Sequence, residues 1–328
     1  MSTETAYPAT GLLHAYVLDG NGGGNKLDWA GVRAWSPADG PLWINVDYTI
    51  DDAASWLASH ANIPALVRDG LLDVDPRPRA VVHDGNLQLI VRGINVNRDA
   101  SPEDMLSVRA WVESRRIVTL RHRVSRSLES IAADLERGAG PRDASDVATV
   151  LVERMLEHLV TRVDELGDDV AAAEDRSLDD PRGELRAQLA DHRRRAIALR
   201  RFLGPQREAF AKLPAINAPW LDADRRGRFA ECADRMTRTI EELDAARDRA
   251  AVTQEELASR VAELTNRRLY LLAIISVIFI PLAFVTSLLG VNFAVPFAGE
   301  AWAFWTMIGV FVVGVSVELW WFRRRGWL

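Results

Sequence analysis

One uncharged stretch near the C-terminus, residues 269–289, constrains this chain more than any other feature. It contains no Asp, Glu, Lys or Arg. Wound as an α-helix at about 1.5 Å per residue, it covers roughly 31 Å, which matches a bilayer hydrocarbon core of about 30 Å. A helix also satisfies its backbone hydrogen bonds internally, as lipid requires. The sequence therefore predicts a membrane-spanning helix here.

A second apolar run, residues 301–322, follows after a short loop and contains Glu318 as its one ionisable residue. Arginines precede the first run at 267 and 268 and follow the second at 323–325, whereas the loop has no Lys or Arg. By the positive-inside rule, both ends of this hairpin are expected in the cytoplasm. Glu318 is expected either to pair with the following arginines at the interface or to take part in proton coupling.

A face of small and polar side chains follows the first run at helical spacing. Two spans alone cannot enclose a water path, so a transported ion would need several copies around one axis. Such a face is typical either of a pore wall or of close packing between helices. Within the run, Pro281 removes one backbone hydrogen bond and predicts a bend. The members of the face, which we call the stripe, are Asn266, Leu269, Ala273, Ser276, Ile280, Ala283, Ser287 and Gly290.

The first span ends in Gly290, Val291 and Asn292, and Asn292 lies eleven residues after Pro281. With the hairpin and the arginine-rich last turn, this tripeptide resembles the Gly-Met-Asn signature of CorA-type divalent cation transporters, in the Gly-Val-Asn form of the ZntB branch. The loop differs from that pattern, because Ala294 and Val295 stand where the pattern has two glycines, and Pro296 comes one position early. Further segments that resemble the branch are 47–48, 77–79, 92–95, 200–201, 205–207, 267–268 and Tyr270.

The resemblance implies a homopentamer in a bacterial inner membrane, with a CorA-like cytoplasmic funnel and the first span lining an axial pore. Asn292 would form the outer selectivity ring, and Glu300 would add an acidic ring at the mouth unless it is simply a solvated loop residue. The transported ion would be Zn²⁺ or another dication in hydrated form, since no His or Cys follows Cys232 to bind zinc directly.

Two other functions remain open at this stage. One is a CorA-like Mg²⁺ channel that also takes Co²⁺ or Ni²⁺, which shares the hairpin and the Asn ring. The other is a non-conducting, membrane-anchored coiled-coil sensor or scaffold, which explains the anchor but gives no reason for the stripe. No HExxH, CxxC or nucleophile-elbow motif is present, so neither an enzyme nor a resident cofactor is predicted.

Composition adds few constraints on the soluble part. The formal charge of −6 indicates no bulk attraction to nucleic acid, and the single Cys excludes an intrachain disulfide framework. The N-terminus shows no signal peptide. The expected partners are therefore divalent cations, membrane lipid and further copies of the chain.

The N-terminal region, residues 1–126, has a mixed pattern that predicts an α+β domain with a largely antiparallel sheet and flanking helices. Short helices are expected at 51–60, entered through Thr49 or Asp51 as cap, and at 64–72. The glycine-rich segment 21–25 is interpreted as a hairpin loop, because no phosphate-binding motif follows it. Strands are expected at 12–18, 41–46, 80–83, 87–96, 107–112 and 116–121.

From residue 127 onward the pattern is helical. Residues 127–221 predict a helical hairpin, with a four-three apolar face from Val152 to Ala173 and a helix at 181–213 that breaks near Gly204 and Pro205. Its acidic tip could hold Mg²⁺ or another dication, or could be an ordinary solvated helix end. The candidate ligands there are Asp168, Asp169, Asp175 and Asp179.

A stalk helix is expected over residues 222–268, continuous with the first span at 269–291. The outer loop is then 292–300, the second span 301–322 and the cytoplasmic tail 323–328. Seven acids and three arginines lie between residues 241 and 263, a net negative stretch that either attracts dications or keeps the stalk soluble. The apolar face of the stalk is Met236, Ile240, Leu243, Ala250, Leu257, Val261 and Leu264.

Overall fold

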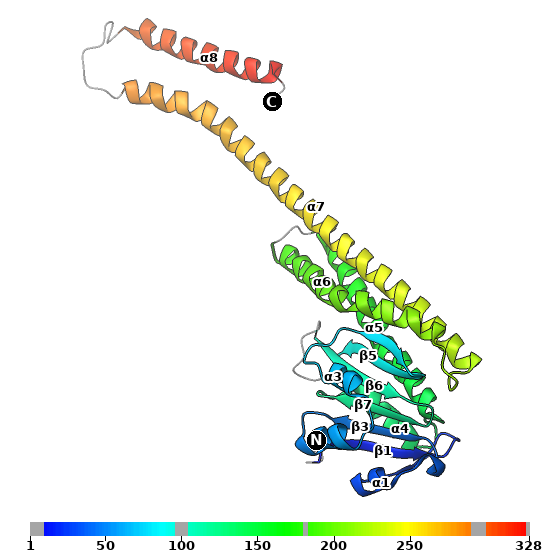
Figure 1. Ribbon diagram of the computed structural model, residues 1–328. Helices are drawn as coiled ribbons and strands as arrows, with labels where there is room; N and C mark the ends of the chain where they lie inside the picture. The colour runs from blue at the N-terminus through cyan, green and yellow to red at the C-terminus, as the bar shows by residue number, and fades with distance from the viewer. Residues whose placement is uncertain (1–9, 96–103, 180–182, 290–299, 326–328) are drawn as a thin grey trace. The chain divides into compact units, whose positions relative to one another are not determined.

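The computed structural model describes residues 10–95, 104–179, 183–289 and 300–325 (Figure 1). The chain divides into two compact units, Met1–Glu255 and Glu256–Leu328. The first unit contains a sheet with helices on both faces, and the second contains a hairpin of two apolar helices. Helix α7 runs through the boundary between them.

The sheet has seven strands in the order β2-β1-β3-β7-β6-β5-β4. All neighbours are antiparallel except β3 and β7, which pair in parallel from Leu42 opposite Arg116. The prediction of a largely antiparallel sheet is therefore confirmed. The bounds are β1 (Leu12–Leu18), β2 (Gly24–Lys26), β3 (Leu42–Asp47), β4 (Arg79–His83), β5 (Asn86–Ile94), β6 (Met105–Val112) and β7 (Arg116–Arg121).

Alternation along the strands gives the sheet two buried faces. In β3, Leu42 and Ile44 belong to one apolar cluster, whereas Trp43 belongs to the other. The first cluster is covered by α1 (Trp29–Ala34), α2 (Asp51–Ser59) and α3 (Ala65–Leu71), with the short 3₁₀ turn η1 at Pro37–Asp39. The second is covered by α4 (Arg126–Glu136) and the long helices that follow.

The predicted cap of α2 is wrong. Ile50 occupies the N-cap position and makes no side-chain capping bond. Thr49 instead donates its hydroxyl to Asp47 Oδ1 at 2.6 Å, which stabilises the turn before the helix rather than its first N–H groups.

Helix α5 (Ala144–Asp179) confirms the four-three pattern, because Val152, Leu156, Leu159, Val163, Leu166, Val170 and Ala173 are all buried. Helix α6 (Gly183–Lys212) continues through Pro205, so the predicted break is wrong. The adjacent Gln206 is fully buried, and its side-chain amide bonds the backbone of Arg92 in β5. This tertiary contact holds the helix where Pro205 removes one internal bond. The 3₁₀ turn η2 (Leu213–Ala215) ends the segment.

Helix α7 (Ala223–Leu289) is a single helix of 67 residues, as the stalk prediction requires. Its apolar face is buried from Met236 to Leu257. The predicted face extends too far, however, because Val261 is 46% exposed and Leu264 45% exposed. Cys232 is buried in the core.

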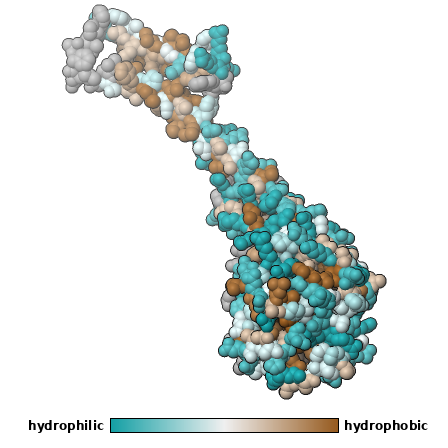
Figure 2. All heavy atoms as spheres, in the orientation of Figure 1, coloured by the Kyte–Doolittle hydropathy of each residue, from teal (hydrophilic) through white to brown (hydrophobic). Residues whose placement is uncertain are grey.

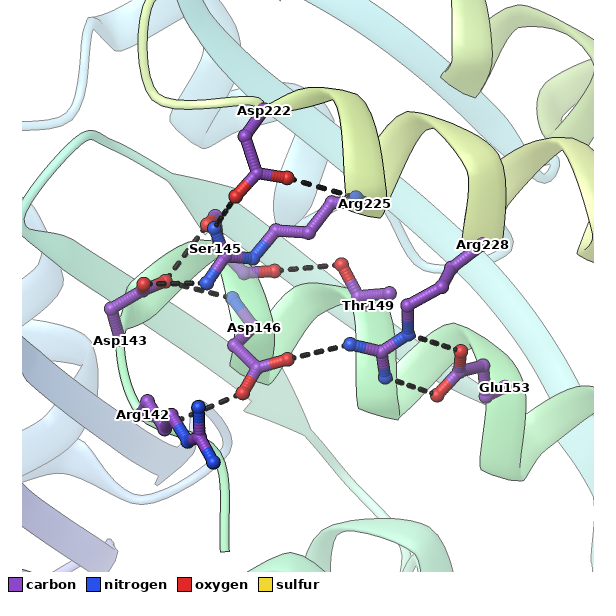
Figure 3. A network of polar contacts seen from close by, with 9 residues as sticks. All are labelled: Arg142, Asp143, Ser145, Asp146, Thr149, Glu153, Asp222, Arg225 and Arg228. Carbon is purple, nitrogen blue, oxygen red and sulfur yellow. Dashed lines mark hydrogen bonds and ion pairs between the residues drawn. The ribbon is translucent and has the colours of Figure 1, made fainter. Parts of the chain in front are cut away.

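A polar network fixes the start of α7 against the start of α5 (Figure 3). Arg225 lies 2.6 Å from both Asp143 and Asp222, one on each helix entry. Arg228 donates to both carboxylate oxygens of Glu153, at 2.7 and 2.6 Å, and to Asp146 at 2.8 Å. Bidentate guanidinium–carboxylate pairs are geometrically specific, so these contacts determine how α7 leaves the domain.

Candidate functional site

The second unit contains the C-terminal part of α7 and the helix α8 (Ala301–Arg324). Both are long and apolar enough to cross a membrane, and neither apolar window is buried in the structure. Figure 2 shows these helices covered largely by hydrophobic side chains, in contrast to the hydrophilic residues along the preceding part of α7. Large exposed apolar surfaces of this kind are stable in lipid or against other chains.

Helix α8 covers one face of the last part of α7. The half-buried residues on that face are Ile274, Val277, Ile278, Pro281 and Val285, and two of them, Pro281 and Val285, line a groove with α8. At about 100° per residue, this face and the stripe are centred roughly 130° apart around the helix. The stripe therefore points away from α8.

Most of the stripe is exposed in the single chain. Asn266, Leu269, Ala273, Ile280, Ala283 and Ser287 are exposed, with Ile280 at 67%, and Ser276 is half-buried. The Ser276 hydroxyl donates to Leu272 O at 2.8 Å, one turn earlier. Its proton is thus used inside the helix, and its lone pairs remain available as acceptors for water around a cation.

The tripeptide Gly290, Val291 and Asn292 lies outside the described residues. Glu300 is described and exposed, at the N-cap position of α8. Its side chain makes no capping hydrogen bond. Among the described residues, the carboxylate is therefore not used by the helix end.

Glu318 forms no ion pair with the arginines that follow it in the described part of α8. Within the described part of the chain it makes no ion pair, and it lines the groove of about 620 Å³ together with Pro281 and Trp321. Arg324 and Arg325 instead lie over the rings of Trp320 and Trp321, at 5.2 and 4.6 Å from the ring centres. The expected pairing of Glu318 with the arginine cluster is thus not formed in the single chain. The sequence did not predict the groove, because it depends on how the two helices cross.

The acidic residues at the end of α5 remain dispersed. Asp168, Asp169 and Asp175 are exposed, and the side chain of Asp179 is outside the described residues. Seven residues separate Asp168 from Asp175, a rise of about 10 Å along a helix, too far for one cation to contact both. Among the described side chains, no group of three or more metal-ligating residues forms.

The acids of α7 divide into two groups. Asp244 accepts from Arg200 at 3.2 Å and lies 3.4 Å from Arg247, so its charge is compensated. Exposed acids without an ion-pair partner in the described structure are Glu241, Glu242, Glu255, Glu256 and Glu263. This second group supplies the negative charge of the α7 surface.

The chain combines a sheet domain, a very long helix and two C-terminal helices apolar enough to cross a membrane, which is the architecture of a membrane-anchored protein. Residues 38–324 match the family described as CorA-like Mg²⁺ transporter protein. The chain belongs to this family. The recognition of CorA-type features from the Gly-Val-Asn hairpin is thereby confirmed.

Relatives match over nearly the whole chain. The zinc transport protein ZntB of Yersinia enterocolitica is 32% identical over 324 residues, covering 98% of each chain. The divalent cation transporter CmaX of Pseudomonas aeruginosa is 36% identical over 324 residues, covering 97% of each. These relatives are named as transporters, and the ions in their names are zinc in one and divalent cations in the other.

Solved structures support the fold. The full-length CmaX protein aligns with a TM-score of 0.86 and 34% identity, covering 98% of this chain and 99% of CmaX. The CorA magnesium transporter of Methanocaldococcus jannaschii aligns with a TM-score of 0.77 at 17% identity, covering 96% of this chain and 98% of its own. At that identity the second match establishes the fold alone.

Proposed function

We propose that this chain is one subunit of a homopentameric transporter that moves hydrated divalent cations, chiefly Zn²⁺, along the stripe of α7. The observation that carries the proposal is the direction of the stripe. It is the small, partly polar face of the first span, and it points away from α8. When copies of the chain form a ring, the face of the first span that is turned away from the second span can line the central axis.

Asn292 would form the outer selectivity ring, next to Gly290 and Val291. Amide oxygens are neutral acceptors that can hold a hydrated cation without removing its water. Glu300, whose carboxylate is not used in capping α8, would raise the local cation concentration at the mouth. The acids at the end of α5, including Asp168 and Asp169, would bind cations only if another copy completes the ligand set.

Orientation follows from the flanking arginines. Arg267 and Arg268 precede the first span, and Arg323, Arg324 and Arg325 follow the second. Both termini would therefore be cytoplasmic, in an inner membrane.

Ion flux into liposomes tests the proposal. Zn²⁺ and Mg²⁺ uptake are compared for the unmodified protein and for Asn292→Ala. Zinc uptake that exceeds magnesium uptake, and is reduced or made unselective by the substitution, is the expected result. Preference for magnesium would favour the CorA-like Mg²⁺ channel, and equal flux from both proteins would remove the selectivity ring.

A cysteine scan tests the stripe itself. In a Cys232→Ser background, a charged, membrane-impermeant thiol reagent should block flux through Ala283→Cys. The matched control is Ile275→Cys, which lies on a lipid-exposed face of the same helix and should be insensitive. Block at both positions, or at neither, would contradict the assignment of the stripe as the pore wall. Absence of flux in every protein would favour the scaffold function.

A further inference from the structure

Helix α6 carries a row of exposed basic side chains. Arg186, Arg193 and Arg201 are exposed and recur after seven and eight residues, so they lie on one face of the helix. Ile197, between two of them on that face, is 52% exposed. None of the three arginines makes an ion pair within the described part of the chain. We call these arginines the basic row.

Helix α7 carries a matching row of acids. Glu241, Asp248 and Glu255 recur every seven residues on one exposed face, and we call them the acidic row. Val252, on the same face, is 56% exposed. Asp248 forms an ion pair with its neighbour Arg247 at 2.7 Å. The two glutamates have no ion-pair partner among the described residues. Each row thus combines charges with one exposed aliphatic side chain.

The two rows lie at the same levels along the helices. Helices α6 and α7 run antiparallel in the first unit (Figure 1), and Arg200 bonds Asp244 between them at 3.2 Å. We count residues in opposite directions along the two helices from that bridge, at about 1.5 Å per residue. Each arginine of the basic row then lies within about 5 Å, along the helix axis, of one acid of the acidic row. The pairs are Arg201 with Glu241, Arg193 with Asp248 and Arg186 with Glu255. Three pairs of opposite charge are therefore in register.

The rows cannot meet within one chain, because each lies on the exposed side of its helix. The opposite faces, which include Leu199 and Leu203 of α6 and Ile240 and Leu243 of α7, are buried in the shared core. A rotation about an axis parallel to α7 leaves the level of every residue unchanged. It can therefore bring the basic row of one copy beside the acidic row of the next.

We propose that the basic row of α6 docks against the acidic row of α7 in an adjacent copy of this chain. Such a contact joins two different faces, so it propagates in one direction and gives a ring where the rotation closes. The inference rests on the proposed oligomer and adds the surface that assembles it. Ile197 and Val252 would supply apolar contact between the charged pairs.

The charged rows contribute more to the choice of which faces pair than to the free energy of association. Exposed ion pairs contribute up to about 1 kcal/mol each. Pairing α6 with α6, or α7 with α7, would instead oppose like charges, which disfavours two-fold contacts through these faces. The rows therefore select a head-to-tail ring over a symmetric dimer.

Charge reversal with rescue tests the contact in the full-length protein. Arg193→Glu with Arg201→Glu, and separately Glu241→Arg with Asp248→Arg, should each lower the assembled fraction in native mass spectrometry at low ionic strength by at least about twofold. The four substitutions together should restore it. Assembly unchanged by either reversal, or no recovery in the combined variant, would overturn the inference.

Chemical crosslinking gives a second readout that does not depend on loss of assembly. In a Cys232→Ser background, Arg193→Cys with Asp248→Cys should give a ladder of linked multiples with a short bis-maleimide, whereas each single cysteine should not. The control pair is Glu208→Cys with Asp248→Cys, because Glu208 lies about 22 Å along α6 from Arg193.

Linked multiples from the first pair alone support the contact, and monomer bands from both pairs overturn it. An unmodified protein that is monomeric in native mass spectrometry would contradict the proposed function as well. An assembled protein with unlinked chains would contradict only this surface.

Discussion

The side-chain amide of Gln206 bonds both backbone groups of Arg92. Its Oε1 accepts from the Arg92 N–H at 2.6 Å, and its Nε2 donates to the Arg92 carbonyl at 2.9 Å. Gln206 is fully buried, and it ties α6 to β5 immediately after Pro205. One residue thus anchors the helix to the sheet.

Replacing Gln206 by Leu should destabilise the protein markedly. Each buried backbone group left unpaired costs about 1–3 kcal/mol. Gln206→Glu should have an intermediate effect, because a carboxylate can accept from the N–H but cannot donate to the carbonyl. Thermal unfolding of the full chain in detergent measures the effect, with exposed Glu208→Ala as the control. Equal midpoints for Gln206→Leu and the control would contradict this role.

Arg228 should be a second sensitive position. Hydrogen bonds to Glu153 raise the pKa of Arg228, so its guanidinium stays charged. Arg228→Ala leaves Glu153 and Asp146 without this partner and should cost about 1–3 kcal/mol. Arg228→Lys should recover only part, since an ammonium cannot bond bidentately. The unfolding midpoint is compared with that of Arg238→Ala, whose pair with Glu231 is exposed. A loss no greater than in that variant would refute the prediction.

Acid should weaken the contact between β1 and α4. His14 Nε2 and Arg121 Nη2 lie 3.1 and 2.8 Å from the two carboxylate oxygens of Glu129. Burial raises the pKa of Glu129, but these hydrogen bonds outweigh it and hold the pKa below its usual value. A depressed folded-state pKa adds stability above the unfolded value, near pH 4.5, which is lost as the pH falls through the folded value.

Glu129→Gln should therefore reduce the amount of stability that the protein loses as the pH falls into the acid range. Because the carboxylate is partly exposed, the difference at neutral pH should be below about 1 kcal/mol. Unfolding midpoints between about pH 3 and 7 measure it. An acid limb as steep in the variant as in the unmodified protein would show that Glu129 does not contribute.

Cys232 should be unreactive in the folded protein. It is 5% exposed, and burial raises the pKa of its thiol to about 12. Only the thiolate reacts with maleimides and disulfides. Labelling at neutral pH should be slow in native conditions and rapid in denaturant, with the exposed position of Arg193→Cys as the reactive control. Fast labelling of native Cys232 would mean that the core opens there.

Glu300→Gln should lower cation uptake at low ionic strength. Five carboxylates at one mouth would raise the local dication concentration, and their loss should reduce initial uptake by roughly twofold to tenfold. The difference should disappear at high salt, because the Debye length falls to about 3 Å at 1 M. An effect independent of salt would indicate a different role.

The strands were the most predictable part of the fold. Alternating apolar residues between Gly, Asp and Pro turns gave Leu12–Leu18 and Arg116–Arg121 with their observed bounds. Strand β2 and helix α1 were not predicted, because three and six residues are too few to show a period. The parallel pairing of β3 with β7 was also not predicted, since it joins strands far apart in the chain.

Helix continuity was harder to predict than helix existence. Pro205 and Pro281 both lie inside continuous helices. A local rule for proline does not include the tertiary contact of Gln206 that fixes α6. The stripe could be predicted from periodicity alone, but its direction relative to α8 could not. The matched levels of the charged rows depend on the Arg200–Asp244 bridge, which no sequence pattern contains.

The parallel pairing of β3 with β7 also orders events during synthesis. Residue 42 lies beside residue 116 in the finished sheet. More than seventy further residues must therefore be translated before β7 can pair with β3. At about 5–20 residues per second, the ribosome needs roughly 4–15 s for that distance. During that interval one edge of β3 has no strand to pair with. The sheet therefore completes its centre last among its strands, and the helices from α4 onward, which cover one of its faces, are translated after that.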